Sequence, residues 1–240
     1  MKRLLCIGLL LTVAAPAAYA KVLYDGTTLP DGQGWTTFFT GGTQTLDPAG
    51  FVAVNTTGNA LYQGGFGQQD ALLNSATGFT LQFSSQVLQE AHSAANNRSG
   101  FSLIVTDQNA VGIEIGFWQD TVWAQNLGFT QGEMIAFDTT TMTDYALTIV
   151  GDHYSLTAGD GAKAKTLSGS TRAYGAQPGS PAIYDTAAAL FFGDDTTSAA
   201  ARFNLKSVSV IAVPEPSSAI ILGGALLTML FTAVVRKRQS

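Results

Sequence analysis

The strongest constraint on the fold is an alternation of apolar and polar side chains that recurs along the central part of the chain. Apolar residues occupy every second position in a series of short segments, namely residues 79–83, 101–105, 111–117, 145–149, 154–158, 203–205 and 208–210. A two-residue period is typical of β-strands that turn one face to a core and the other to solvent. Gly, Asp, Asn and Ser, which favour turns, separate these segments. The pattern predicts an all-β body over residues 21–213.

Three local features refine this prediction. Residues Val150–His153 contain a Gly-Asp pair and join two alternating segments, which indicates a tight hairpin. The alternation slips between Leu205 and Val208, and a β-bulge around residues 206–207 would explain the slip. Residues 87–95 also fit a helical period, so this is the one stretch of the body where a helix competes with a strand.

Many short strands in a body of this length predict a two-sheet antiparallel β-sandwich of the jelly-roll type. The order of features resembles that of concanavalin A-like lectin and glucanase domains. A first strand at Val22–Tyr24 is followed by a tryptophan-containing segment at Asp31–Trp35, and a Phe-Phe-Gly-Asp-Asp segment at Phe191–Asp195 precedes a last strand at Phe203–Ile211. The resemblance implies that the last strand pairs beside the first.

The N-terminus has the layout of a secretory signal peptide. Lys2 and Arg3 precede an apolar run over residues 4–15, and Ala18 and Ala20 form a small-residue cleavage site. The apolar run is short for crossing about 30 Å of hydrocarbon, which disfavours an uncleaved anchor. We therefore expect residues 1–20 to direct export through the Sec translocon and to be removed. The only cysteine, Cys6, would leave with them, so the exported chain could form no disulfide.

The C-terminus carries a second hydrophobic segment. The motif Pro214-Glu215-Pro216 leads into 17 apolar or small residues, Ala219–Val235, which end at the basic cluster of residues 236–238. Seventeen residues are near the lower limit for a transmembrane helix. The positive-inside rule would keep the basic cluster in the cytoplasm and the body outside. A plain C-terminal membrane anchor is one interpretation of this tail.

The whole tail, residues 214–240, resembles the PEP-CTERM sorting signal of Gram-negative bacteria. That signal combines a Pro-Glu-Pro motif, here Pro214, Glu215 and Pro216, with a hydrophobic helix and a basic terminus in this order. The resemblance implies recognition by an exosortase, processing near the motif, and display at the cell surface or release into the extracellular matrix. It covers only the tail and carries no information about the activity of the body.

Charge is distributed unevenly along the chain, whose formal net charge is −5. Residues 21–213 hold 7 basic and 16 acidic side chains, a net charge of −9, whereas both ends are basic. A nucleic-acid-binding protein needs clustered cations that neutralise phosphates. The acidic body therefore argues against a nucleic-acid partner. The resemblance of the tail to a sorting signal of exopolysaccharide-producing bacteria implies polysaccharide as the partner instead.

Candidate ligand-binding residues follow from the segment at 111–126. Apolar residues of the strand face the core, while Glu114 lies on the other face between Gly112 and Gly116, which would leave space above the carboxylate. The aromatic and polar residues around it are those of a sugar-binding groove, in which rings stack on sugars and polar groups bond to hydroxyls. The predicted ligand-binding set is Glu114, Trp118, Asp120, Trp123 and Asn126. An ordinary solvent-facing strand face is the alternative interpretation.

The sequence predicts no catalytic residue. Glycoside hydrolysis usually needs two carboxylates about 5–10 Å apart. Concanavalin-like glucanases often place theirs in a Glu-x-Asp-x-x-Glu pattern, but here Gly116 and Gln119 stand at the second and third acidic positions after Glu114. A glycoside hydrolase, with Glu133 as a possible second acid in space, remains an alternative, as does a matrix or adhesion protein without a specific ligand.

No cofactor is expected except for weak calcium candidates. Asp194 and Asp195 lie next to each other in a loop-like segment and could supply oxygen ligands to calcium, although a turn held by aspartate hydrogen bonds explains them as well. His92 and His153 are isolated in the sequence, so neither predicts a metal site.

Overall fold

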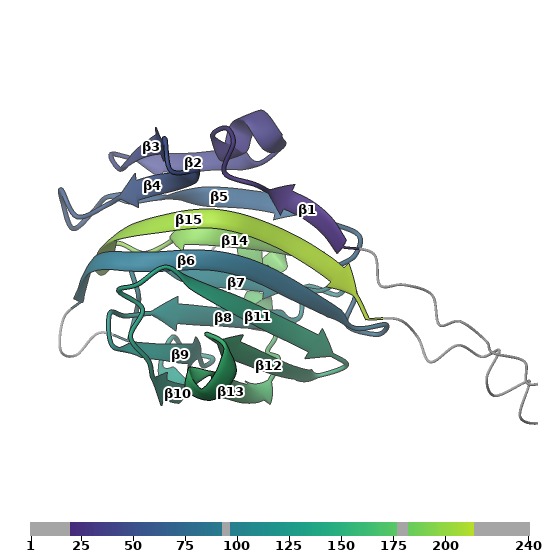
Figure 1. The fold of residues 1–240 in the computed structure, drawn as a ribbon. Coiled ribbons are helices and arrows are strands. Elements are labelled where there is room, and N and C mark those ends of the chain that lie inside the picture. The colour runs from purple at the N-terminus through teal and green to yellow at the C-terminus, as the bar shows by residue number, and fades with distance from the viewer. Residues whose placement is uncertain (1–19, 93–96, 177–181, 214–240) are drawn as a thin grey trace, which may run out of the picture. The chain divides into compact units, whose positions relative to one another are not determined.

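The computed structural model describes residues 20–92, 97–176 and 182–213 (Figure 1). In these ranges the chain forms fifteen β-strands, arranged in two antiparallel sheets, and four short 3₁₀ helices. The two antiparallel sheets form a β-sandwich, so the predicted fold class is confirmed. In the described part of the chain, no helix is long and apolar enough to cross a bilayer. Residues 1–19 of the predicted signal peptide, the sorting motif and the 219–235 helix lie outside the described residues.

The eight-stranded sheet has the order β13–β12–β11–β6–β15–β4–β3, with β1 also paired to β15. Its strands are β1 (Ala20–Tyr24), β3 (Thr43–Asp47), β4 (Phe51–Asn55), β6 (Phe79–His92), β11 (Thr143–Val150), β12 (His153–Ala158), β13 (Lys165–Ser170) and β15 (Ala199–Ala212). The long strands β6 and β15 pair at its centre. Since Ala20 lies opposite Ile211, the predicted pairing of the first and last strands is confirmed.

The seven-stranded sheet has the order β10–β9–β8–β7–β14–β5–β2. Its strands are β2 (Thr36–Thr40), β5 (Gln63–Gln69), β7 (Ser102–Thr106), β8 (Gly112–Phe117), β9 (Thr121–Gln125), β10 (Gln131–Ala136) and β14 (Ala189–Asp194). The 3₁₀ helices are η1 (Pro30–Gln33), η2 (Gly161–Lys163), η3 (Tyr174–Ala176) and η4 (Ala182–Asp185).

Local predictions about the strands can be compared with this topology. The tight hairpin is confirmed, because Val150 pairs with His153 where β11 turns into β12. The bulge is also confirmed, because the register of β15 against β6 shifts between Leu205 and Ser207. The helical alternative for residues 87–95 is wrong over 87–92, which continue β6 and pair with β15.

The main core lies between the sheets and is built from the alternating apolar positions. Ile113, Ile115 and Phe117 of β8 are fully buried in it, as the alternation predicts. Phe83 of β6 stacks on Tyr145 of β11 with ring centroids 4.9 Å apart, within the range that aromatic pairs prefer. Each fully buried side chain of this size contributes about 1.5–3 kcal/mol. With no cysteine among the described residues, packing of this kind holds the sandwich together.

A second, smaller apolar cluster lies on the opposite face of the seven-stranded sheet. It contains Ile104, Tyr174, Tyr184 and Phe191, with Phe129 and Ile183 packed against it. Tyr174 and Tyr184 come from η3 and η4, so these two helices cover the outer face of the central strands of the sheet. This cover decides which side chains of the sheet are accessible to a ligand.

Candidate functional site

Glu114 lies beneath this cover and has no exposed surface. Its Oε1 accepts a hydrogen bond of 3.0 Å from Ser102 Oγ of β7, and its Oε2 accepts one of 2.5 Å from the Tyr184 hydroxyl. The prediction that Glu114 stands on an open, solvent-facing strand face is therefore wrong. The space beside the two glycines is occupied: a backbone bridge from Gly112 to Arg172 runs on one side, and the Trp123 indole lies over Gly116 on the other.

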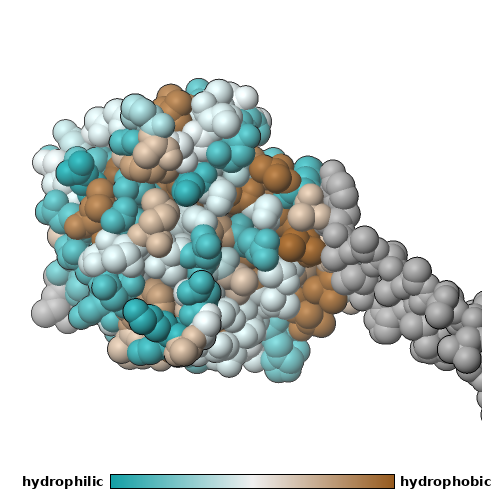
Figure 2. Space-filling view, viewed as in Figure 1, coloured by the Kyte–Doolittle hydropathy of each residue, from teal (hydrophilic) through white to brown (hydrophobic). Residues whose placement is uncertain are grey.

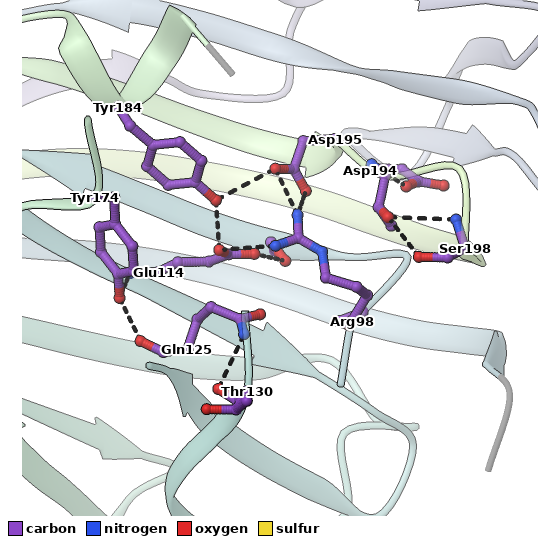
Figure 3. A network of polar contacts seen from close by, with 12 residues as sticks. Arg98, Glu114, Gln125, Thr130, Tyr174, Tyr184, Asp194, Asp195 and Ser198 are labelled. Carbon is purple, nitrogen blue, oxygen red and sulfur yellow. Dashed lines mark hydrogen bonds and ion pairs between the residues drawn. The ribbon is translucent and has the colours of Figure 1, made fainter. Parts of the chain in front are cut away.

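Arg98 joins Glu114 to a second carboxylate, Asp195 (Figure 3). The Arg98 Nη2 atom donates to both Asp195 oxygens at 2.9 and 2.8 Å, while Nη1 lies 3.5 Å from Glu114 Oε2. The guanidinium also lies over the ring of Phe129, 4.6 Å from its centroid, in a cation–π contact. Burial alone would lower the pKa of Arg98, but the carboxylates of Glu114 and Asp195 raise it by more than burial lowers it. The pKa therefore lies above its usual value, and the guanidinium remains a cation.

Two acidic side chains therefore share one guanidinium inside a largely enclosed cluster. Burial, followed by repulsion from Asp195, raises the pKa of Glu114 to about 7, and Arg98 opposes that shift only in part. Burial and the same carboxylates also raise the pKa of Tyr184, which keeps its hydroxyl protonated as a donor to Glu114. We name the group of Arg98, Glu114, Tyr184 and Asp195 the buried polar cluster.

The other predicted ligand-binding residues lie in different surroundings. Trp123 is fully buried, and Trp118 is half-buried with its ring stacked on His92 at a centroid distance of 3.8 Å. Asn126 donates to the backbone carbonyl of Gln131 across a turn. Asp120 is exposed and lines a separate depression of about 380 Å³ beside β10. Trp118 and Trp123 pack against each other with ring centroids 5.6 Å apart, but the structure does not gather the predicted residues around one open groove. Ligand contact by any of them stays a prediction.

Asp194 and Asp195, the weak calcium candidates, are used in different contacts within the protein. The buried Asp194 accepts a 2.6 Å hydrogen bond from Thr56 Oγ1, and burial raises its pKa to about 8, whereas Asp195 binds Arg98. Over residues 20–92, 97–176 and 182–213, no group of three or more His, Cys, Asp or Glu side chains is arranged to hold a metal ion.

An open groove does lie on the outer face of the seven-stranded sheet, next to the region that η3 and η4 cover. Its volume is about 560 Å³. It crosses β2, β5 and β14, and it is lined by Thr36, Phe38, Gln63, Gly67, Gln68, Gln69, Ala182, Ile183, Thr186, Ala189, Phe191 and Asp195. We name it the β2–β5–β14 groove. Asp195 belongs both to this groove and to the buried polar cluster.

The floor of the β2–β5–β14 groove depends on glycines. A Cβ atom on Gly65 would lie 2.6 Å from Phe191 Cζ, and one on Gly193 would lie 2.9 Å from the same atom. The Phe191 ring can therefore lie close to the sheet only because both positions lack side chains. Phe38, on the edge strand β2, is 48% exposed and presents an aromatic face at the side of the groove.

Chemically, the groove combines apolar surface with neutral polar groups. Phe38, Ile183 and Phe191 provide the apolar surface, and the amides of Gln63 and Gln69 can donate and accept hydrogen bonds. Asp195 is the charged residue among the side chains that line it. Such a surface can hold a ligand that has both an apolar face and hydroxyl groups.

The sequence prediction missed this groove. The signal that was present is the run Gln63–Gln69, in which positions 63, 65, 67 and 69, which share one strand face, are Gln, Gly, Gly and Gln. Small residues on one face of a strand leave room above the sheet. Phe38 gave no distinct signal, because it stands next to Phe39, which packs inward against Phe66.

A further depression, of about 340 Å³, lies on the eight-stranded sheet and is lined by residues of β6, β11, β12 and β15, among them Ser84, Asp144 and Ser207. Its polar groups bond to each other: Ser84 donates to Asp144, and Ser207 Oγ donates to Ser84 Oγ at 3.2 Å. These mutual contacts leave it a weaker candidate than the β2–β5–β14 groove.

In comparisons of sequence, no family model and no curated protein matches the chain. Comparisons of structure do find similar folds. A carbohydrate esterase of the Shiga toxin-encoding bacteriophage phi24B superposes with a TM-score of 0.52 at 14% identity, covering 81% of this chain and 99% of the esterase chain. A protein of unknown function from Shewanella oneidensis MR-1 gives a TM-score of 0.53 at 12% identity, covering 87% and 96% of the two chains.

A lectin from Bauhinia forficata in complex with GalNAc is also similar, with a TM-score of 0.46 at 9% identity over 82% of this chain and 99% of the lectin. At such low identities these likenesses concern the fold alone. The chain is a β-sandwich that shares its fold with the phage carbohydrate esterase and with the Shewanella protein.

Proposed function

We propose that the protein is an exported, surface-sorted protein whose β-sandwich binds polysaccharide without catalysing a reaction. The observation that carries the binding proposal is the β2–β5–β14 groove, where the exposed ring of Phe38 stands beside the amides of Gln63 and Gln69. Aromatic rings stack on the apolar faces of sugar rings, and amides bond to their hydroxyls. The fold neighbours, which include lectins, agree with this proposal at the level of fold.

The environment of Glu114 supports a role without catalysis. A catalytic carboxylate must reach the proton or the carbon atom on which it acts. Glu114 has no exposed surface, and both of its oxygens already accept hydrogen bonds from Ser102 and Tyr184. Its raised pKa, a property that catalytic acids also have, follows here from burial beside Asp195.

The proposed location rests on the two ends of the chain. The signal peptide predicts export, and the tail with Pro214-Glu215-Pro216 predicts a stage at the inner membrane, recognition by an exosortase, and display at the surface or in the matrix of a Gram-negative bacterium. Apart from Ala20, the first residue of β1, all described strands lie between these signals, and β15 ends at Ala212. Removal of both ends would therefore leave every described strand in place, apart from Ala20 itself.

Binding to a panel of immobilised polysaccharides tests the groove, with Phe38→Ala as the variant. We expect its affinity for the bound polysaccharide to fall on the order of tenfold, about 1.4 kcal/mol, because the variant removes the aromatic face. Met134→Ala is the matched control, since Met134 is 54% exposed on β10 at the opposite edge of the same sheet. Equal affinity of the two variants for the polysaccharide would show that the β2–β5–β14 groove is not the binding site.

Release of reducing sugars from the same polysaccharides tests the absence of catalysis. We expect none from the purified protein. Release that disappears in Glu114→Gln would instead establish a glycoside hydrolase. Binding to no polysaccharide at all would favour a matrix or adhesion protein without a specific ligand.

A further inference from the structure

An apolar surface patch lies at one end of the eight-stranded sheet, where β1 begins and β15 ends. It consists of Val22, Val150, Ile211 and Val213, which we name the terminal patch. Val22 is 64% exposed and Val150 is 49% exposed, while Ile211 and Val213 are half-buried. Figure 2 shows hydrophobic surface gathered at the end of the domain where β1 begins and β15 ends.

The four residues are contiguous because strand pairing brings them together. Val22 lies opposite Ser209, two residues before Ile211 on the neighbouring strand. Val150 Cγ2 and Val213 Cβ lie 3.0 and 3.3 Å from the point that a Cβ of Gly78 would occupy, so the two valines flank that glycine. The Val213 amide also donates to the Gly78 carbonyl at 3.0 Å, which fixes the end of the described chain beside the hairpin.

The chain beyond Val213 limits what can lie next to this patch. Five residues, 214–218, separate Val213 from the apolar segment Ala219–Val235. Fully extended, they reach about 20 Å, because each residue spans at most about 3.6 Å. While the apolar segment is in a membrane, the Val213 end of the domain must stay within that distance of the bilayer.

We propose that the terminal patch rests on the lipid bilayer surface while the tail is inserted and before it is processed. This inference depends on the membrane stage of the proposed function. Apolar side chains at an interface insert into the boundary between headgroups and acyl chains, whereas charged groups stay hydrated. Lys21, Asp152 and His153 border the patch, and the side chains of Asp152 and His153 are 82% and 75% exposed. The contact is therefore at headgroup depth, with the valines inserted and these polar groups in water.

The test uses the full chain reconstituted into phosphatidylcholine vesicles, with Cys6→Ser so that one introduced cysteine carries a fluorescent label. The label is placed by Val150→Cys in the terminal patch. Leu88→Cys is the control, because Leu88 is 38% exposed on β6 of the same sheet, nine residues along the strand from Phe79, or about 30 Å. Both variants are quenched with aqueous iodide and with quenchers attached to the lipid.

We expect lipid-attached quencher to quench the label at position 150 at least threefold more strongly than the label at position 88, and iodide to show the reverse. Vesicle flotation is measured in parallel. Equal quenching at the two positions in a chain that floats with the vesicles would overturn the inference and leave the membrane stage intact. A chain that does not float would overturn the membrane stage, and the inference with it.

Discussion

The Glu114 carboxylate is enclosed with a second carboxylate, Asp195, and a single guanidinium, that of Arg98. One cation cannot fully compensate two buried anions, so the enclosure favours the protonated form of Glu114 and raises its pKa to about 7. The Tyr184 hydroxyl and Ser102 satisfy the oxygens of Glu114, which limits the cost of burial. These residues determine how the protein responds to pH.

We predict that stability falls as pH rises through the weakly acidic range. The pKa of Glu114 is about 7 in the folded protein and near 4.5 when the chain is unfolded, so between these values only the folded state holds the proton. The contribution of Glu114 to the free energy of unfolding should therefore decrease with rising pH, by up to about 3 kcal/mol, and be lost above about pH 7. Asp194, whose pKa is raised to about 8, acts in the same direction.

Urea unfolding at about pH 5 and about pH 8 measures this effect. Glu114→Gln should reduce the difference between the two pH values, whereas Asp152→Asn, which removes an exposed carboxylate, should leave it unchanged. Glu133 has a lowered pKa, so its ionisation makes the free energy of unfolding rise with pH instead. The difference between the variants, and not the pH dependence of the native protein alone, therefore measures the contribution of Glu114. An unchanged pH dependence in Glu114→Gln would contradict this account of the buried polar cluster.

The alternation of residues predicts which side of β8 faces the core, and Ile113, Ile115 and Phe117 lie there. The alternation could not predict that Glu114, on the other side of the strand, is buried. The residues that cover Glu114, Tyr174 and Tyr184, lie 60 and 70 positions further along the chain. A local pattern shows that a strand has a second face, but contacts at such a separation determine whether that face meets water.

At the level of secondary-structure elements, three strands that are distant in sequence build the groove. The strands β2, β5 and β14 pair side by side, and the segment around η4 forms one wall. Strand positions, the hairpin and the bulge could be predicted because each leaves a local signal in turn residues or phase. The groove could not, because it depends on which strands become neighbours and on where the cover over the sheet ends.

Gly65 is a position at which this arrangement leaves no room for a side chain. In Gly65→Ala the new Cβ would lie 2.5 Å from the Phe192 carbonyl oxygen and 2.6 Å from Phe191 Cζ. We expect a loss of about 1–3 kcal/mol in the free energy of unfolding, the range typical of overpacking. Gly67→Ala is the control on the same strand, since its nearest contact would be an ordinary 3.8 Å from the Leu190 carbonyl. Equal stability of the two variants in urea would contradict the described packing of Phe191.

For the whole molecule, the acidic charge of the body predicts selectivity among polysaccharides. Residues 21–213 carry a net charge of −9, and the described side chains that line the groove include Asp195 but neither Lys nor Arg. We expect a neutral polysaccharide that binds to lose affinity when it is oxidised to its uronate form. Thr36→Lys, which adds a cation to an exposed position of the groove, should restore part of that affinity.

Thr36→Gln is the neutral control for this substitution. Binding assays at about 0.15 M salt keep the comparison local, since charges farther than about 8 Å are then largely screened. Uronate binding as strong as that of the neutral polymer in the native protein would show that charge does not determine the choice of ligand.

The organisation of the whole chain predicts the mass of the mature protein. The exported form should lack residues 1–20, and in cells with an active exosortase it should also lack residues 219–240. Intact mass spectrometry of the protein from the cell envelope and from the medium measures both. A mature chain that retains residues 219–240 in such cells would contradict sorting through the Pro-Glu-Pro tail.

The central claim is that the β2–β5–β14 groove is the binding site. Hydrogen–deuterium exchange with and without a bound polysaccharide tests this claim most directly. The account predicts slower exchange in Thr36–Thr40 of β2 and Gln63–Gln69 of β5 when ligand is present, with no change over residues 118–126. Slower exchange over residues 118–126, with β2 and β5 unaffected, would contradict it and would move the site to the side of the sheet that carries Trp118, Asp120 and Asn126.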